Sequence, residues 1–217
     1  LPEAYVMGLN DIVGTSVRNT RVLGTFYQQG QWLFYPVAFS VKSSIPLLLL
    51  LPVGVCALAM DRARRRQLLY LLVPPVVFLA IAMSSKFTGS VRHILQVYPY
   101  FILVAGFGLS ALWARGRGWR LAAAILLVYQ AVAVVRTAPD YIPFANAFWG
   151  GPAKAHDVLT FGSVEWGQSL KRIRAHIDRN GIRRCWIASS TGAPTSPRRS
   201  ASATIGTSRA SATSSGK

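Results

Sequence analysis

The chain has 217 residues, 52% of them hydrophobic and 14% charged, with 24 Lys and Arg against 7 Asp and Glu and a formal net charge of +17 at pH 7. In a soluble protein this excess would indicate a nucleic-acid partner, but here the basic residues cluster beside long apolar runs, where anionic lipid headgroups are their natural partners. We therefore expect a membrane protein whose partner is the lipid bilayer, with no nucleic acid.

Residues 1–42 are predicted to be exoplasmic, as a loop followed by an interfacial aromatic segment. Leu1–Val13 is compatible with a helix lying against the membrane. The aromatic run Trp32–Phe39 is expected to break at Pro36, because proline removes a backbone hydrogen bond from a helix. Joining this run to the next apolar stretch would place Lys42 inside the bilayer, at a cost of about 2.5–3.5 kcal/mol.

Residues 43–138 are predicted to form a four-span transmembrane region. Its apolar runs contain no Asp, Glu or Lys, and the terminal Arg136 is their only arginine: 43–60, 67–85, 94–114 and 121–136. A helix rises about 1.5 Å per residue, so roughly 20 residues cross a hydrocarbon layer about 30 Å thick. The predicted fold class is an all-α polytopic membrane bundle of about four transmembrane helices.

Two arginine-rich loops orient the bundle. Residues 61–66 join the first and second runs, residues 115–120 join the third and fourth, and together they hold seven arginines. Short loops rich in Lys and Arg remain on the cytoplasmic side of a membrane. Both loops are therefore predicted to be cytoplasmic, and both ends of the chain exoplasmic, in a bacterial plasma (inner) membrane.

Prolines and glycines within the runs predict how the helices bend and pack. Two glycines of the third run, Gly106 and Gly108, are expected to let another helix approach closely. Kinks are expected at five prolines, which membrane helices tolerate when neighbouring helices satisfy the backbone: Pro46, Pro52, Pro74, Pro75 and Pro99.

Residues 139–188 are predicted to be an exoplasmic connection, an amphipathic helix and a short strand. The helix is expected to begin after a cap at Ser163, to end at Gly181, and to carry one apolar stripe: Trp166, Leu170, Ile173 and Ile177. The strand is expected at Ile182–Ala188. Since a lone strand needs partners, these elements predict a small truncated exoplasmic α/β piece.

Residues 189–217 are predicted to be a disordered low-complexity tail. Ser, Thr, Ala, Gly, Pro and Arg dominate it, and Ile205 is its only large apolar residue, so it cannot bury enough surface to offset the entropy of ordering. The composition changes where a small domain would continue. A native tail and a shifted reading frame are both open explanations.

Three segments carry recognisable motifs. Gly30–Leu47 contains an aromatic-Pro-Val-Ala-Phe stretch before a span, Val91–Tyr100 reads Arg-His-Ile-Leu-Gln-Val-Tyr-Pro after its first residue, and Gly150–Ala153 is followed by Glu-Trp-Gly-Gln-Ser-Leu-Lys-Arg at 165–172. In this order and spacing they resemble the C-terminal portion of bacterial multi-span glycosyltransferases that use a polyprenyl-phosphate sugar donor. That group includes protein O-mannosyltransferases and lipid A aminoarabinose transferases.

The resemblance implies an exoplasmic site for the donor phosphate. The candidate residues are Arg92, His93 and Lys42, at the outer starts of the third and first runs. Cations beside an apolar groove suit a lipid phosphate, and arginine can bind phosphate oxygens in a bidentate fork. The alternative is that these side chains only anchor the helix ends in the membrane interface.

A second group of candidates lies at the start of the predicted outer helix: Glu165, Trp166, Gln168 and Lys171. They are assigned either to the acceptor side or to structure, because a carboxylate is favourable near a helix amino end and a tryptophan in an apolar stripe packs in a core. The three histidines have no Cys or carboxylate partners at metal-ligand spacing. No cofactor is expected beyond the lipid-linked sugar, which is a substrate, and a divalent metal is left open.

The predicted function is therefore transfer of a sugar from a polyprenyl-phosphate donor to an exoplasmic acceptor that the sequence does not identify. The resemblance implies a catalytic base in an earlier exoplasmic loop. Glu3, Asp11 and Asp140 match no such motif, so no base is assigned and this portion alone is expected to be inactive. The alternatives are a transporter, a non-catalytic subunit of a membrane complex, or a soluble nucleic-acid binder; uncharged spans without an inverted repeat disfavour transport.

Overall fold

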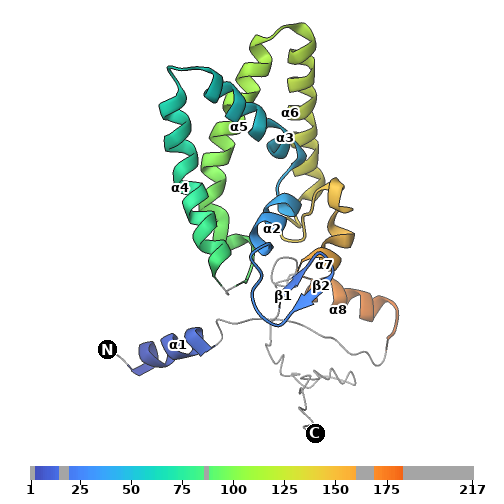
Figure 1. Cartoon of the computed structure of the whole chain (residues 1–217). Coiled ribbons are helices and arrows are strands. Elements are labelled where there is room, and N and C mark those ends of the chain that lie inside the picture. Colours follow the sequence, from blue (N-terminus) through green and yellow to red (C-terminus); the bar gives the residue numbers. More distant parts are fainter. Residues whose placement is uncertain (1–2, 15–19, 86–87, 160–168, 183–217) are drawn as a thin grey trace. The chain divides into compact units, whose positions relative to one another are not determined.

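The chain is described by a computed structural model that covers residues 3–14, 20–85, 88–159 and 169–182 (Figure 1). These belong to two compact units, residues 1–164 and residues 165–217. The described architecture is mainly helical, with one two-stranded sheet.

A helical bundle forms most of the first unit: α3 (Ile45–Met60), α4 (Arg65–Ser84), α5 (Tyr98–Ala114), which follows the 3₁₀ helix η1 (Val91–Val97), and α6 (Arg117–Thr137). Within the described residues, three helices are long and apolar enough to cross a membrane: α4, η1 continued by α5, and α6. Val77 on α4 and Val128 on α6 are 51% and 63% exposed. Apolar faces of this kind are stable when lipid rather than water surrounds them.

The first predicted span is a pair of helices with a sharp bend between them. α2 (Phe34–Lys42) and α3 meet at 112°, so the pair adds a fourth crossing only if it counts as one span. The bend lies at Ser43 and Ser44, whose backbones are extended. The prediction of a break at Pro36 was wrong, because Pro36 lies in the first turn of α2, where its missing N–H breaks no helical hydrogen bond.

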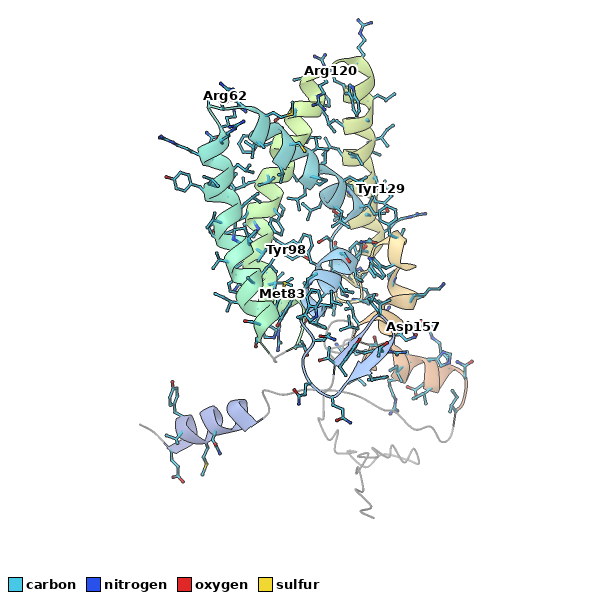
Figure 2. All side chains as sticks on the ribbon, viewed as in Figure 1. Arg62, Met83, Tyr98, Arg120, Tyr129 and Asp157 are labelled. Atoms are coloured by element: carbon cyan, nitrogen blue, oxygen red, sulfur yellow. The ribbon has the colours of Figure 1, made fainter. Side chains whose placement is uncertain are left out.

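The two arginine-rich loops lie at one end of the bundle. Figure 2 shows Arg62 of the first loop and Arg120 of the second at the same end, away from Met83 and Asp157. The guanidinium of Arg64 also lies over the ring of Phe107 in α5, 6.0 Å from its centroid. The prediction that both loops lie on the same side of the bundle agrees with this arrangement. Their cytoplasmic location stays a prediction.

α3 and α5 cross in close backbone contact at Gly54 and Gly108. A Cβ atom added to Gly54 would lie 1.9 Å from the carbonyl oxygen of Val104, and one added to Gly108 would lie 2.4 Å from that of Leu50. Small residues permit such close crossings between membrane helices. The prediction for Gly108 is confirmed, whereas that for Gly106 was wrong, because a Cβ there would meet nothing within 4 Å.

The prolines divide between helix starts and helix interiors. Pro52 lies inside α3, and Pro74 and Pro75 lie inside α4. Pro46 and Pro99 instead lie in the first turns of α3 and α5, where proline fits the helix geometry. The kinks predicted at the five prolines stay predictions.

A β-hairpin precedes α2. Its strands β1 (Thr20–Val22) and β2 (Thr25–Tyr27) pair antiparallel and are joined by Leu23 and Gly24. Both turn residues have positive φ, 51° and 84°, as a two-residue hairpin turn requires. This hairpin was not predicted from the sequence, although β-branched and aromatic residues flank Gly24.

α2 belongs to the core of the first unit. Phe34 is fully buried and Tyr35 is 2% exposed, whereas Trp32 before the helix is 57% exposed. The core around α2 also includes Val22 of the hairpin and Ile94 of η1. The prediction of an interfacial aromatic belt was therefore wrong for Phe34 and Tyr35, because these rings pack against protein.

Short elements after α6 complete this core: η2 (Ala147–Trp149), η3 (Pro152–Lys154) and α7 (Ala155–Val158). The backbone N–H of Leu23 donates to the carbonyl oxygen of Val158 at 3.0 Å, and Val22 forms an isolated bridge with Leu159. The chain at the end of α7 therefore contacts the hairpin.

The outer helices are present with altered bounds. α1 (Glu3–Gly14) agrees with the predicted helix near the start, and its contact with a membrane stays a prediction. α8 (Leu170–Arg179), in the second unit, has Ser169 at its N-cap position, so the prediction of Ser163 as its cap was wrong. Gly181 follows its end with a φ of 59°, as expected of a helix-terminating glycine.

Two predicted segments fall almost entirely outside the described residues. They are the strand at Ile182–Ala188, of which only Ile182 is described, and the low-complexity tail at 189–217. Both stay predictions.

Candidate functional site

A groove in the first unit is bounded by α3, α5, α6 and the segment that follows α6. Its volume is about 530 Å³. Tyr98 and Leu109 of α5 both line it, and at about 1.5 Å per residue they are about 16 Å apart along the helix, roughly half of a hydrocarbon layer about 30 Å thick. Along α6 the groove extends from Thr137, the last residue of that helix, to Leu127 at its middle.

The groove is apolar over most of its length and polar at one end. Its apolar lining residues are Pro46, Leu47, Leu50, Ile102, Ala105, Gly106, Leu109, Leu127, Ala133, Val134 and Phe144. Its polar lining residues are Lys42, Ser43, Ser44, Tyr98, Gln130, Thr137 and Tyr141. All of these except Gln130 lie at helix ends or in loops, on the side of the bundle opposite the arginine-rich loops.

Lys42 is the one charged residue among those that line the groove. It is the last residue of α2 and is half-buried, and its Nζ donates a hydrogen bond to the carbonyl oxygen of Ile142 at 3.0 Å. A lysine ammonium has three N–H donors, so this bond leaves two for a ligand. The polar end of the groove can therefore place a positive charge against an anionic group.

Contacts around Ser43 connect the end of α2 to the start of α5. The Ser43 hydroxyl donates to the Tyr98 hydroxyl at 3.2 Å, and Ser43 is only 1% exposed. The ring of Phe39 lies 5.3 Å from that of Tyr98 and 5.2 Å from that of Phe101, centroid to centroid. These contacts hold the residue next to Lys42 in one position.

Asn146, which is 3% exposed, donates hydrogen bonds to backbone carbonyl oxygens at the end of α2, although it lies in a distant part of the chain. Its Nδ2 donates to the carbonyl oxygens of Ser40 at 2.6 Å and Ser43 at 2.8 Å, and its backbone N–H donates to that of Val41 at 3.0 Å. The last carbonyls of a helix lack partners within the helix and need others when buried. Asn146 supplies them and so fixes the backbone on both sides of Lys42.

The Gly-Gly-Pro motif forms a tight turn next to Asn146. Gly150 has φ 81° and Gly151 has φ 72° with ψ −169°, conformations in which glycine is strongly favoured. The backbone N–H of Gly151 donates to the carbonyl oxygen of Asn146 at 3.1 Å. Both glycines are therefore required by the path of the backbone.

Arg92 and His93 lie on η1, and neither is among the residues that line the groove. Arg92 is exposed, and its Nε donates to Nε2 of His93 at 3.5 Å, the long limit of a hydrogen bond. This contact requires an unprotonated Nε2 on His93. Of the three predicted donor-phosphate residues, the structure brings Lys42 alone to the groove, and the roles of Arg92 and His93 stay predictions.

The predicted acceptor-side group belongs to the second unit. Lys171 lies in the first turn of α8 and is exposed. Glu165, Trp166 and Gln168 lie outside the described residues. The assignment of these four residues stays a prediction.

Two residues at this site were not singled out from the sequence. Gln130 is a half-buried amide in an otherwise apolar stretch of α6, and polar residues inside membrane spans commonly face other helices or ligands. Asn146 stands between two alanines in an aromatic segment, and only the long-range hydrogen bonds reveal its role. Gln130 could have been recognised from the sequence as a polar residue in an apolar span, whereas Asn146 could not.

Among the described residues, no group of three or more His, Cys, Asp or Glu side chains is placed to hold a metal ion. Comparison of the chain with family models, curated proteins and solved structures finds no match. The family resemblance therefore rests on the three sequence segments.

Proposed function

We propose that the chain is part of an integral membrane glycosyltransferase that moves a sugar from a polyprenyl-phosphate donor to an exoplasmic acceptor. In this proposal the donor phosphate lies beside Lys42, and the first isoprene units of its chain lie in the groove. The observation that carries the proposal is the groove itself, which is apolar from its polar end to about the middle of α6 and has a single lysine among its polar end residues.

The shape and surroundings of the groove support an amphiphilic ligand. Ile102 and Leu127 line it and are 56% and 46% exposed, so the groove opens toward the apolar surface that lipid covers. A lipid chain can enter sideways from the bilayer while its phosphate stays at the polar end. Charge-assisted hydrogen bonds from an ammonium to a phosphate are among the stronger contacts available there.

Packing among the resemblance segments also supports the proposal. Val37 and Val41 from the first segment share a core with Ile94 and Val97 from the second. The third segment joins them through the hydrogen bonds between Gly151, Asn146 and the end of α2. Residues far apart in sequence thus build one structural unit around Lys42.

In the proposed reaction, an acceptor nucleophile bonds to the anomeric carbon of the sugar while the bond to the phosphate oxygen breaks. Negative charge grows on the leaving phosphate, and Lys42 stabilises that charge. Arg92 and His93 are proposed to assist from η1, and Glu165 with Gln168 to face the acceptor. No residue of this chain is assigned as the catalytic base.

Binding of decaprenyl phosphate to the purified chain in detergent tests the proposal without requiring turnover. Lys42→Gln should weaken binding about 10- to 100-fold, the effect of losing a charged hydrogen bond of about 1.5–3 kcal/mol. Lys154→Gln, at an exposed lysine outside the groove, is the matched control. Equal affinity of the Lys42→Gln variant and the unmodified chain would refute the assignment.

The proposed role of Arg92 on η1 is tested by transfer assays in a catalytically competent enzyme that contains this chain. Arg92→Ala should abolish transfer while leaving expression normal. Retained turnover would remove Arg92 from the donor site and leave it as an interfacial anchor.

A further inference from the structure

The end of the bundle opposite the groove carries a repeated arrangement of arginines. Arg65, the first residue of α4, donates through Nε to the carbonyl oxygen of Ala59 at 2.9 Å. Arg120, in the first turn of α6, donates through Nε to that of Trp113 at 2.8 Å. Ala59 and Trp113 are the penultimate residues of α3 and α5, so each arginine binds the end of the helix before its own.

These bonds orient the two guanidinium groups. A helix leaves its last carbonyls without intrahelical partners, so an arginine that donates to one is held at the helix end and is favoured by the helix dipole. A guanidinium has five N–H donors, and using Nε leaves the four on its Nη atoms. Both side chains are exposed and can present these donors to an anion.

The surroundings favour the phosphate of a lipid over a soluble anion. Residues 61–66 and 115–120 hold seven arginines and one acid, Asp61, which pairs with Arg64 at 3.2 Å. Trp113 and Trp119 are 49% and 52% exposed at the same end, and exposed tryptophans are typical of the headgroup layer. Anionic headgroups attract such basic segments, and the planar guanidinium binds phosphate in two-point contacts.

We propose that Arg65 and Arg120 form two binding sites for the phosphates of anionic phospholipids, on the side of the bundle opposite the groove. The sites are independent of the proposed transferase function. Each retains a lipid against a helix junction, α3 to α4 or α5 to α6. The surrounding arginines raise the local concentration of anionic lipid but do not form the specific contacts.

The test replaces arginine by lysine, which keeps the charge and therefore the membrane orientation but removes the two-point fork. One variant carries Arg65→Lys and Arg120→Lys, and the matched control carries Arg62→Lys and Arg117→Lys in the same loops. Native mass spectrometry of the full chain in detergent counts retained dioleoylphosphatidylglycerol, and melting temperatures are measured with this lipid, with dioleoylphosphatidylcholine and with inorganic phosphate.

We expect the unmodified chain and the control variant to retain phosphatidylglycerol and to melt at a higher temperature in its presence. The Arg65→Lys, Arg120→Lys variant should bind it about tenfold more weakly. The single variants Arg65→Lys and Arg120→Lys are measured as well. For every variant, the melting temperature without lipid shows whether folding itself has been lost, so that a loss of lipid binding is distinguished from a loss of folding. Equal losses in both double variants, no loss in either, or equal stabilisation by inorganic phosphate would each overturn the proposal.

Discussion

The side-chain amide of Asn146 donates to the carbonyl oxygen of Ser43 at 2.8 Å, across 103 positions of sequence. This bond, with its companion to Ser40, holds the chain where α2 turns by 112° into α3. It therefore connects the segment after α6 to the polar end of the groove.

Asn146→Ala should destabilise the protein by about 2–4 kcal/mol, because the buried carbonyl of Ser43 and the partly buried carbonyl of Ser40 would lose their donors at about 1–3 kcal/mol each. Unfolding by sodium dodecyl sulfate titration measures the change. Asn180→Ala is the control, since its amide donates to the carbonyl oxygen of His176 at an exposed site. A similar small effect for both variants would contradict the structural role of Asn146.

Gly108→Ala should destabilise the α3–α5 crossing by about 1–3 kcal/mol, because the new methyl group would lie 2.4 Å from the backbone oxygen of Leu50 and the helices must separate. Gly106→Ala, on the same helix, should be neutral or slightly stabilising, because its Cβ meets nothing within 4 Å and alanine favours helix. Melting temperatures in one detergent compare the pair. The reverse order of stabilities would exclude this crossing.

Gly151→Ala should cost about 1–3 kcal/mol through backbone strain alone. Its φ of 72° with ψ −169° is almost confined to glycine, yet a Cβ there would meet nothing within 4 Å. Gly118→Ala in the first turn of α6 has equal space and no such strain, so it should be tolerated. Comparable stability of the two variants in denaturant titrations would argue against the turn.

Thiol labelling in oriented membrane vesicles tests the topology. With Cys56 and Cys185 replaced by serine, cysteines at Ala63 and at Gly118 should react with an impermeant maleimide from one side only, the same side for both. A cysteine at Lys154 should react from the other side. Labelling of Ala63→Cys and Gly118→Cys from opposite sides would remove the shared basic face, and with it the phospholipid sites proposed there.

Some features of the fold followed directly from composition. Uncharged apolar runs long enough for a bilayer predicted α4, α5 and α6 to within a few residues, because a membrane span must satisfy its backbone internally and avoid charge along most of its length. The arginine-rich loops likewise predicted which connections share an end, since an even number of spans separates them. The hairpin at 20–27 was missed because it is short and its signal is local.

Less of the candidate site than of the fold could be predicted from the sequence. Lys42 was predicted as a donor-phosphate residue, but its place at the mouth of a groove depends on α3, α5 and α6 packing side by side. Phe34 and Tyr35 were predicted to belong to an interfacial aromatic belt, because an aromatic run has the same composition whether it faces headgroups or a protein core. Only the partners of α2 distinguish the two environments.

The sequence alone determined that the apolar helices of this protein suit a lipid solvent and that its basic loops lie together, because hydropathy and charge act locally along a chain. Tertiary structure decided how α2 and α3 bend, where Gly54 meets Gly108, and which lysine faces the groove. These features depend on contacts between residues far apart in sequence, such as Asn146 and Ser43, which no local pattern encodes.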